Sequence, residues 1–286
     1  MERNIPTRIS QRPMTVIGGG TLGRAIAFAH AVKGTRVRIY DPDKATRESA
    51  AAFIAERRQS LSASQDSSFG EVSTTSELDE ALREAWFVVE AVPERRDLKI
   101  DVLGDLDEEA EPDAIIGTNS TTLPSRMLIE KVRNPERLLN IHYYRPPECP
   151  AVDLMSCGRT HRSVIDFLLK ILPRYGLRPF ETKADSSAFI PVRLWTAVKR
   201  EAMSILAEGL ATPAEIDEMT YAAGYAPRGK GIFRRMDRNG LDVALDIENQ
   251  ALERDPSLPT AARDVLRRYV KAGKLGKKSG EGFYKY

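Results

Sequence analysis

The stretch MTVIGGGTLGRAIAFAHAVKG, residues 14–34, decides the fold of this chain. A short apolar run ends in glycine, and apolar residues then recur at the spacing of a helix. This order of strand, glycine turn and helix is typical of a βαβ unit that binds a dinucleotide, although three adjacent glycines alone could form a merely flexible turn. Gly18 makes the tight turn, Gly20 lets the backbone approach a pyrophosphate, and Gly23 lets the helix pack closely on the strand.

The residues after the turn favour NAD as the dinucleotide. Thr21 and Leu22 begin the helix, whose N-terminus attracts phosphate charge. Asp41 lies 18 residues after Gly23 and ends the next strand pattern. A carboxylate in that place accepts hydrogen bonds from a ribose hydroxyl and repels the 2′-phosphate of NADP. The alternative is that Asp41 is only a turn residue before Pro42.

The composition is that of an ordinary globular protein. The chain has 286 residues and a mass of 31.9 kDa, enough for two domains. Its 43 basic and 41 acidic side chains leave a net charge of +2, which provides no basis for binding nucleic acid or a membrane surface. Cys149 and Cys157 cannot form a disulfide framework and no zinc-type spacing is present, so we expect no metal.

The two cysteines favour a reducing compartment, and the apolar runs and the start of the chain favour a cytoplasmic protein. No apolar run approaches the roughly 20 residues of a membrane span. The start MERNIPTRISQRP is polar and lacks the apolar region of a secretory signal, although its three arginines leave an organelle address as an alternative.

Strand and helix patterns alternate over the first part of the chain. The strand patterns are 14–17, 35–43, 71–76, 86–92, 114–119 and 138–144, and the helix patterns are 44–61, 76–85 and 94–109. We expect Ser76 and Asp79 to cap the second of these helices. The alternation predicts an α/β fold with a doubly wound, parallel Rossmann-type sheet in a domain of residues 1–185.

The pattern changes after residue 185. Residues 192–210 form a long amphipathic helix pattern, and the next begins with Thr212 as cap and Pro213 in the first turn. No convincing strand pattern follows. We therefore expect residues 186–286 to form an all-helical domain.

Seven segments of the chain occur in an order that is familiar from one enzyme family. They are VIGGGTLGRAIA, EAVPERRDLKIDVLGDLDE, TNSTTLP, NIHYYRPP, EIDEM, GLDVALDI and GKKSGEGFYKY. Together they resemble the L-3-hydroxyacyl-CoA dehydrogenases, including their 3-hydroxybutyryl-CoA members. The resemblance implies an NAD-binding domain followed by a helical domain that also builds a homodimer, and a small-molecule substrate.

The resemblance also implies roles for individual residues. Glu94 and Lys99 match positions that contact the nicotinamide half of NAD, and Lys278 matches a lysine that reaches the cofactor from the C-terminal domain. Thr121 matches a serine whose hydroxyl touches the substrate oxygen. His142 matches the catalytic histidine. Each charged residue could instead lie on a solvated face, where such side chains are usually found.

His142 suits the chemistry that the resemblance implies. Oxidation of a secondary alcohol requires a base for the hydroxyl proton, and histidine has the side-chain pKa nearest neutrality. His30, in the first helix pattern, and His161, at a helix start, are poorer candidates. The alternative is that His142 is a structural residue at a strand end.

A carboxylate must also orient such a base, and Asp153 is the candidate. The family has a glutamate in the strand after the histidine. Asp153 takes this position if one residue is deleted from the PPECP loop. Strand alternation supports the choice because Val152 and Leu154 would face the opposite side.

Two departures from the family concern the substrate. Arg145 replaces an asparagine after the histidine segment, and Val192 replaces a second asparagine next to Pro191, which interrupts the segment between the domains. An arginine offers a permanent cation and a fork for a carboxylate or phosphate. One hypothesis is a carboxylate-bearing substrate bound by Arg145; the other keeps an acyl-CoA substrate and gives Arg145 a contact with the cofactor or a carboxylate side chain.

Three classes of function remain open at this point. The first is an NAD-dependent enzyme that interconverts a 3-hydroxy and a 3-oxo group on an acyl-CoA or a related acid. The second is a dinucleotide-binding protein that has lost turnover, and the third uses the same pocket for non-redox acid-base chemistry. The identity of the substrate and the direction of reaction are left open.

Overall fold

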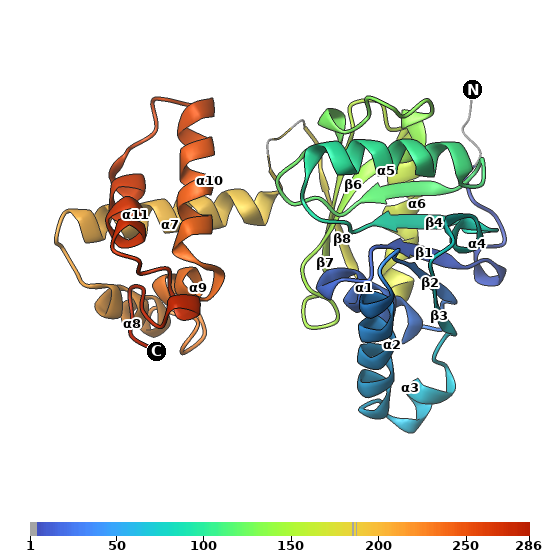
Figure 1. Ribbon diagram of the computed structural model, residues 1–286, viewed down its shortest axis with the longest axis horizontal. Coiled ribbons are helices and arrows are strands. Elements are labelled where there is room, and N and C mark those ends of the chain that lie inside the picture. Colours follow the sequence, from blue (N-terminus) through green and yellow to red (C-terminus); the bar gives the residue numbers. More distant parts are fainter. Residues whose placement is uncertain (1–4, 185, 187) are drawn as a thin grey trace. The chain divides into compact units, whose positions relative to one another are not determined.

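The computed structural model describes residues 5–184, 186 and 188–286, which divide into two compact units. The first unit ends at Phe189 and the second begins at Ile190 (Figure 1). Asp185, at which we expect the nucleotide-binding domain to end, lies outside the described residues. No helix in the described part of the chain is long and apolar enough to cross a membrane.

An eight-stranded sheet forms the centre of the first unit, in the order β3-β2-β1-β4-β5-β6-β7-β8. The strands are β1 Met14–Ile17, β2 Val37–Tyr40, β3 Val72–Thr75, β4 Phe87–Glu90, β5 Ile115–Thr118, β6 Leu138–Tyr143, β7 Ala151–Ser156 and β8 Arg178–Thr182. Strands β1 to β6 are parallel to one another, which confirms the doubly wound, Rossmann-type architecture.

The sheet is not parallel throughout, because β7 runs antiparallel to β6 and β8 is parallel to β7. Only residues 144–150 join β6 to β7. A parallel connection needs a crossover of about a dozen residues or more, so this short link forms a hairpin. The sheet is thus mostly parallel, with one antiparallel pair between β6 and β7.

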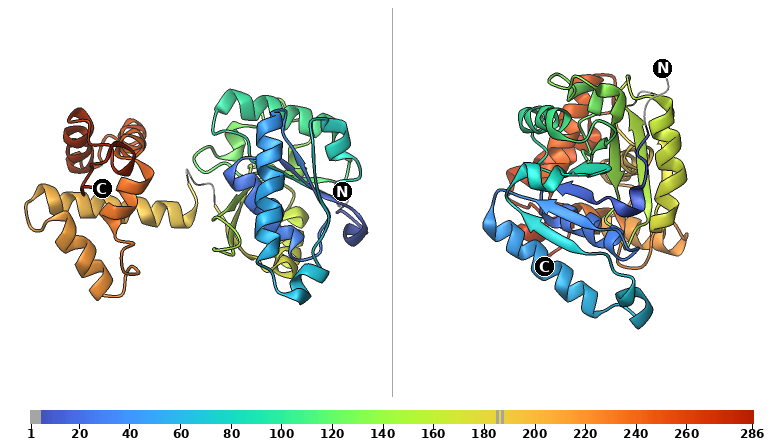
Figure 2. Two further views of the ribbon diagram at one scale, coloured as in Figure 1. Left: turned by 60° about the horizontal axis from the view of Figure 1, so that its bottom comes forward. Right: turned by 90° about the vertical axis from the view of Figure 1, so that its right-hand side faces the viewer.

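Helices cover both faces of the sheet (Figure 2). They are α1 Thr21–Ala31, α2 Lys44–Gln59, α3 Ala63–Ser67, α4 Leu78–Leu82, α5 Arg96–Glu109 and α6 Arg162–Ile171, with short 3-10 turns at η1 Ile9–Gln11, η2 Ser125–Met127, η3 Pro135–Arg137 and η4 Leu172–Tyr175. Apolar side chains of α1, α2 and α6 share one buried cluster with β1, β2 and β4. Those of α4 and α5 share another on the opposite face.

Two local expectations for the first unit are corrected. The expected cap of α4 by Ser76 and Asp79 is wrong: the Ser76 hydroxyl bonds to the neighbouring Glu77 carboxylate at 3.0 Å, and Glu77 occupies the N-cap without a side-chain cap bond. Sequence reasoning also missed β8. This edge strand contains Pro179, a residue that argues against a strand unless the strand lies at an edge.

The second unit is built from helices among its described residues. They are α7 Ile190–Ala207, α8 Pro213–Ala222, α9 Ile232–Asn239, α10 Leu241–Arg254 and α11 Ala261–Lys271, followed by the 3-10 turn η5 Lys277–Ser279. Met203, Phe233 and Leu266 lie in its core. This confirms the all-helical C-terminal region.

Helix starts in the second unit follow ordinary rules. Thr212 caps α8 in a capping box, in which its hydroxyl accepts from the Glu215 amide at 3.3 Å and the Glu215 carboxylate accepts from the Thr212 amide at 2.8 Å. This confirms the expected cap. Pro191 is the second residue of α7 and does not interrupt it, because proline is tolerated in the first turn of a helix.

Candidate active site

The glycine turn between β1 and α1 has the backbone that its sequence predicts. Gly18 has a φ of +102°, and a Cβ there would lie 2.8 Å from the carbonyl oxygen of Ala91. A Cβ on Gly23 would lie 1.9 Å from the Gly18 carbonyl oxygen. A Cβ on Gly20 would meet no heavy atom within 4 Å. Gly18 and Gly23 are thus required by the fold, whereas Gly20 faces open space at the start of α1.

Asp41 is held beside this turn. One carboxylate oxygen accepts from the Gly19 amide at 2.8 Å, and the other accepts from the Asp43 amide at 3.0 Å. The carboxylate therefore lies at the carboxyl end of β2, next to a helix N-terminus that no side chain caps. These groups fit the ribose and pyrophosphate of a dinucleotide.

A buried ion pair lies behind the site at the end of β4. The Lys99 ammonium group, on α5, is 2.7 Å from Glu90 Oε1, 3.1 Å from the Val92 carbonyl and 3.5 Å from Glu94 Oε2. The side chains of Lys99 and Glu90 are 1% and 0% exposed. Lys99 is therefore enclosed as a link between two glutamates and is neither a solvated cation nor open to a cofactor.

Sequence reasoning missed Glu90, although its signal was present. Glu90 is the acidic last residue of a strand that is otherwise apolar and fully buried. Its second carboxylate oxygen accepts from the Thr118 hydroxyl at 2.6 Å. An unpaired buried carboxylate is very costly, so a partner such as Lys99 could have been sought.

Glu94 joins the loop after β4 to the loop after β5. Its Oε1 accepts from the Ser120 hydroxyl at 2.6 Å and from the amides of Thr121 and Thr122 at 3.0 and 2.8 Å. Desolvation would raise the pKa of Glu94, but the bonds from Ser120 and Thr122 and the charge of Lys99 outweigh it and lower the pKa. Glu94 is therefore ionised at neutral pH and fixes the loop that carries Thr121.

His142 lies near the carboxyl end of β6, with 7% of its surface exposed. Its Nδ1 is 3.4 Å from the Asn119 carbonyl oxygen, in the segment after β5. A carbonyl can only accept, so this contact requires the proton on Nδ1 and leaves the lone pair of the neutral ring on Nε2. Phe189 stacks on the ring at 5.2 Å and 12°.

The surroundings of His142 favour its neutral form. Burial lowers the pKa of His142, and the contact with the Asn119 carbonyl and the charge of Glu94 only partly oppose this effect. The imidazole is therefore uncharged at neutral pH and can accept a proton at Nε2.

Asp153 lies opposite His142 but does not bond to it. The two residues are partners in the register of β6 and β7. Among the described residues, however, the Asp153 carboxylate accepts its hydrogen bond from the Tyr144 hydroxyl. The expected contact between His142 and Asp153 is thus replaced, because aspartate is short and the longer tyrosine reaches it from the diagonal position of the hairpin.

Arg145 is the second residue of the loop between β6 and β7. Its side chain is exposed, and its φ of 57° lies in the left-handed region. Asparagine adopts this backbone more readily than arginine does, so Arg145 carries some backbone strain. The nearby Glu148 pairs with Arg57 of α2 at 2.9 Å.

The remaining candidates make contacts of their own. His30 is fully buried, with Nε2 3.0 Å from the Tyr143 hydroxyl, and His161 caps α6 by accepting from the Ser163 amide at 3.3 Å. Lys278 pairs with Asp242 inside the second unit. Val192 is half-buried in the first turn of α7. No shared role for these residues follows from their contacts.

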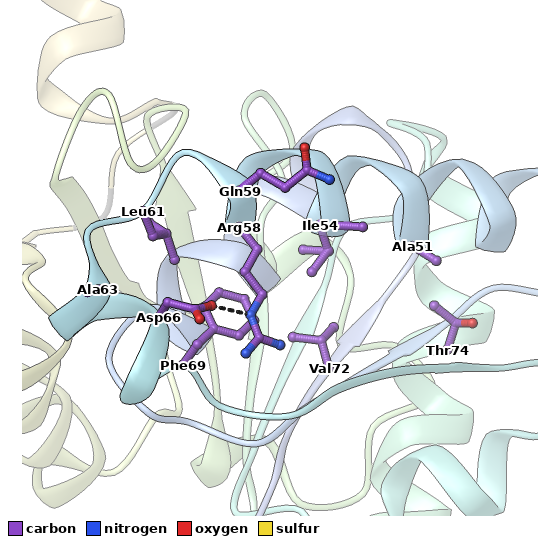
Figure 3. Close-up of a pocket in the computed structure, with 11 residues that line it drawn as sticks. Ala51, Ile54, Arg58, Gln59, Leu61, Ala63, Asp66, Phe69, Val72 and Thr74 are labelled. Atoms are coloured by element: carbon purple, nitrogen blue, oxygen red, sulfur yellow. Dashed lines mark hydrogen bonds and ion pairs between the residues drawn. The ribbon is translucent and has the colours of Figure 1, made fainter.

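A separate hollow of about 810 Å³ lies between α2, α3 and β3 (Figure 3). Apolar side chains such as Ile54 and Phe69 line it together with the ion pair of Arg58 and Asp66, whose atoms are 2.6 Å apart. Four strands separate β3 from β6 in the sheet. The hollow is therefore remote from His142 and takes no part in its chemistry.

The residues that the structure brings together lie where the parallel strands of the sheet end. Gly18, Asp41, Glu90, Asn119 and His142 all stand at or just after the carboxyl ends of parallel strands, where open α/β sheets bind their ligands. A glycine turn, a carboxylate placed to bind a ribose and a neutral histidine beside one another fit an NAD-dependent oxidoreductase.

The chain belongs to the 3-hydroxyacyl-CoA dehydrogenase family. The family's NAD-binding domain matches residues 13–185, and its C-terminal domain matches residues 189–286. NAD is accordingly the cofactor.

Relatives of the chain differ in their named substrates. A 5-formyl-3-hydroxy-2-methylpyridine 4-carboxylate 5-dehydrogenase of Mesorhizobium japonicum is 27% identical over 96% of this chain and 91% of its own. An L-carnitine dehydrogenase of Pseudomonas putida is 32% identical over 80% and 72%. The solved structure of (S)-3-hydroxybutyryl-CoA dehydrogenase from Ralstonia eutropha has a TM-score of 0.85 at 26% identity, covering 96% of this chain and 99% of its own.

Proposed function

We propose that the chain interconverts a 3-hydroxy and a 3-oxo group on an acyl-CoA or a related acid, with His142 as acid and base. The observation that carries this proposal is the neutral, buried imidazole of His142, whose Nδ1 is engaged by the Asn119 carbonyl and whose Nε2 holds the lone pair. NAD, which the glycine turn and Asp41 would hold, would supply the hydride transfer in either direction.

The residues around His142 can each be given a role in proton transfer or in binding the substrate oxygen. In oxidation Nε2 of His142 takes the hydroxyl proton, and the charge of Glu94 favours the imidazolium that results. We assign Thr121 to the substrate oxygen because Glu94 holds its amide, while its hydroxyl bonds to no other described residue. In reduction the imidazolium returns the proton to the same oxygen.

Family membership leaves the substrate open, since the relatives are named for an acyl-CoA, for carnitine and for a pyridine carboxylate. Arg145 favours a substrate that carries a carboxylate. Its exposed guanidinium follows His142 by three residues. Its charge helps to lower the pKa of Glu148, but the guanidinium has no ion pair or hydrogen bond among the described residues. A planar fork of this kind suits a carboxylate.

NADH oxidation tests both parts of the proposal. Purified protein is assayed with acetoacetyl-CoA and with a panel of 3-oxo acids, and NADH binding is followed separately by fluorescence. His142→Gln should lower kcat about 100-fold or more without weakening NADH binding. NADH binding without turnover of any compound would contradict the proposed reaction.

Arg145→Ala separates the two kinds of substrate. We expect it to lower kcat/KM for a carboxylate-bearing 3-oxo acid about tenfold or more and to leave acetoacetyl-CoA unchanged. Equal loss for both substrates would instead assign Arg145 to the cofactor or to a carboxylate side chain.

We also propose that the chain forms a homodimer. Ile190, Leu194 and Val198, spaced by four along α7, are 49%, 63% and 44% exposed. An apolar stripe of this kind calls for a partner surface. Leu194→Glu should convert the dimer to a monomer in sedimentation velocity, whereas a wild-type monomer would refute the proposal.

A further inference from the structure

The hairpin of β6 and β7 gathers three side chains on one face. His142 and Tyr144 are two residues apart and therefore point to the same side. Asp153 is the register partner of His142. Tyr144 follows at the strand end, where its amide meets the Ala151 carbonyl at 3.4 Å, so that it lies diagonal to Asp153. An aromatic side chain can span such a diagonal.

Tyr144 contacts both of the other residues. Its hydroxyl donates to Asp153 Oδ2, and its ring meets the imidazole edge-on, with centroids 4.6 Å apart and planes at 85°. Asp153 is 2% exposed. Burial, together with the neighbouring carboxylate, raises the pKa of Tyr144, so its hydroxyl remains a donor at neutral pH.

We propose that Tyr144 is a positioning residue that holds Asp153 away from His142 and thereby keeps the resting imidazole uncharged. A carboxylate opposite the imidazole could instead accept from its N–H and would then favour the imidazolium. Tyr144 occupies Oδ2 of Asp153, and the Asn119 carbonyl, which has no charge, takes the N–H of His142. The proposal rests on the proposed function of His142 as the base.

Among the groups around His142, Asp153 is the carboxylate that could accept the imidazole N–H if it were released. Glu94 faces the imidazole from the loop before α5, and its carboxylate is already held by the segment after β5. Cys149 faces Tyr144 from the hairpin loop. Phe189 and the Asn119 carbonyl, which also contact the ring of His142, do not titrate.

Tyr144→Phe tests the proposal because it keeps the ring and removes the hydroxyl. The chain has three histidines, so NMR can follow the titration of His142 directly in the full-length protein without any substrate. We expect the titration of His142 to move upward by about one pH unit. The rate of alcohol oxidation on the acid side of the pH profile should fall about tenfold.

Tyr143→Phe is the matched control. Tyr143 is the adjacent residue of β6, and its hydroxyl contacts His30 on the other face of the sheet. This variant should leave the titration of His142 unchanged. Adding Asp153→Asn to Tyr144→Phe should reverse the upward shift, since no carboxylate then remains to be released.

The outcomes separate this inference from the proposed function. An unchanged or lowered titration of His142 in Tyr144→Phe overturns the role of Tyr144, even if the enzyme turns over. A raised titration that Asp153→Asn reverses supports the role, even if no substrate of the panel is oxidised. Should Tyr144→Phe fail to fold, the single variant Asp153→Asn tests the proposal. An unchanged titration of His142 in this variant supports the proposal. A titration of His142 that falls by about one pH unit overturns it.

Discussion

Gly20 and Gly23 belong to one turn, but glycine is needed at each position for a different reason. A side chain on Gly23 would overlap the Gly18 carbonyl, so the contact between β1 and α1 requires glycine there. A side chain on Gly20 would enter open space. The need for glycine at this second position arises only when a pyrophosphate approaches the backbone.

Two alanine substitutions should therefore affect different properties, one the stability of the fold and the other the affinity for NADH. Gly23→Ala should lower the free energy of unfolding by about 1–3 kcal/mol, because the added methyl group has no room. Gly20→Ala should unfold like the wild type but bind NADH about tenfold more weakly or worse. Urea unfolding and NADH fluorescence measure the two quantities, and equal NADH binding by Gly20→Ala would contradict the assignment of this turn.

Asn119 combines two contacts that depend on one residue. Its side-chain oxygen accepts from the Tyr143 amide at 2.9 Å, while its carbonyl engages His142. Asn119→Ala should lower the free energy of unfolding by about 1–3 kcal/mol, because a buried N–H loses its acceptor. Alanine keeps the main-chain carbonyl that engages His142 but loses the side-chain bond that fixes this carbonyl beside β6, so kcat should also fall about tenfold, with NADH affinity unchanged. Steady-state kinetics with kcat near the wild-type value would show that the side chain of Asn119 does not help to position the base.

The sequence was most informative about residues whose role is set by local backbone. The glycine turn, the cap by Thr212 and the order of strands from β1 to β6 all follow from nearby residues, and each is found in the structure. The cap of α4 is an exception, because the Ser76 hydroxyl bonds to Glu77 instead. It was least informative about partners that meet only after folding. Pairing of Glu90 with Lys99 and of Asp153 with Tyr144 depends on where side chains of separate elements point, which no spacing along the chain reveals.

At the scale of elements, a buried histidine links α1 to β6. His30 is 0% exposed, its Nε2 contacts the Tyr143 hydroxyl at 3.0 Å, and its Nδ1 has no partner among the described residues. Burial lowers the pKa of His30 to about 3. The folded protein therefore keeps this ring neutral over a pH range in which an unfolded chain would protonate it.

Lowering the pH should lower the free energy of unfolding, because His30 is buried in its neutral form. Between about pH 6.5 and about 3 the unfolded state binds one more proton at His30 than the folded state, so the free energy of unfolding falls as pH is lowered. The loss from this group is roughly 1 kcal/mol per pH unit in that window. Urea unfolding at pH 7, 6 and 5 measures it. His30→Phe, which cannot titrate, should show a shallower dependence, and an equal slope would contradict the assignment.

At the scale of the whole molecule, the chain contains cores that belong to different units. Two apolar clusters pack on the faces of the sheet, and a third lies among the helices after Ile190. The C-terminal segment folds onto the third. Asp237, which is 0% exposed, accepts from the amides of Phe283 and Tyr284 at 2.9 Å each, so the last residues of the chain are held by one buried carboxylate.

Calorimetry of the full-length protein should therefore resolve two unfolding transitions, since each unit has a core of its own. NADH at about 100 times its Kd should stabilise the unit with the glycine turn by about 2.7 kcal/mol and raise one transition only. Asp237→Asn should lower the other transition, because one of the two bound amides loses its acceptor. A single transition that shifts with both NADH and Asp237→Asn would show instead that the two units unfold as one.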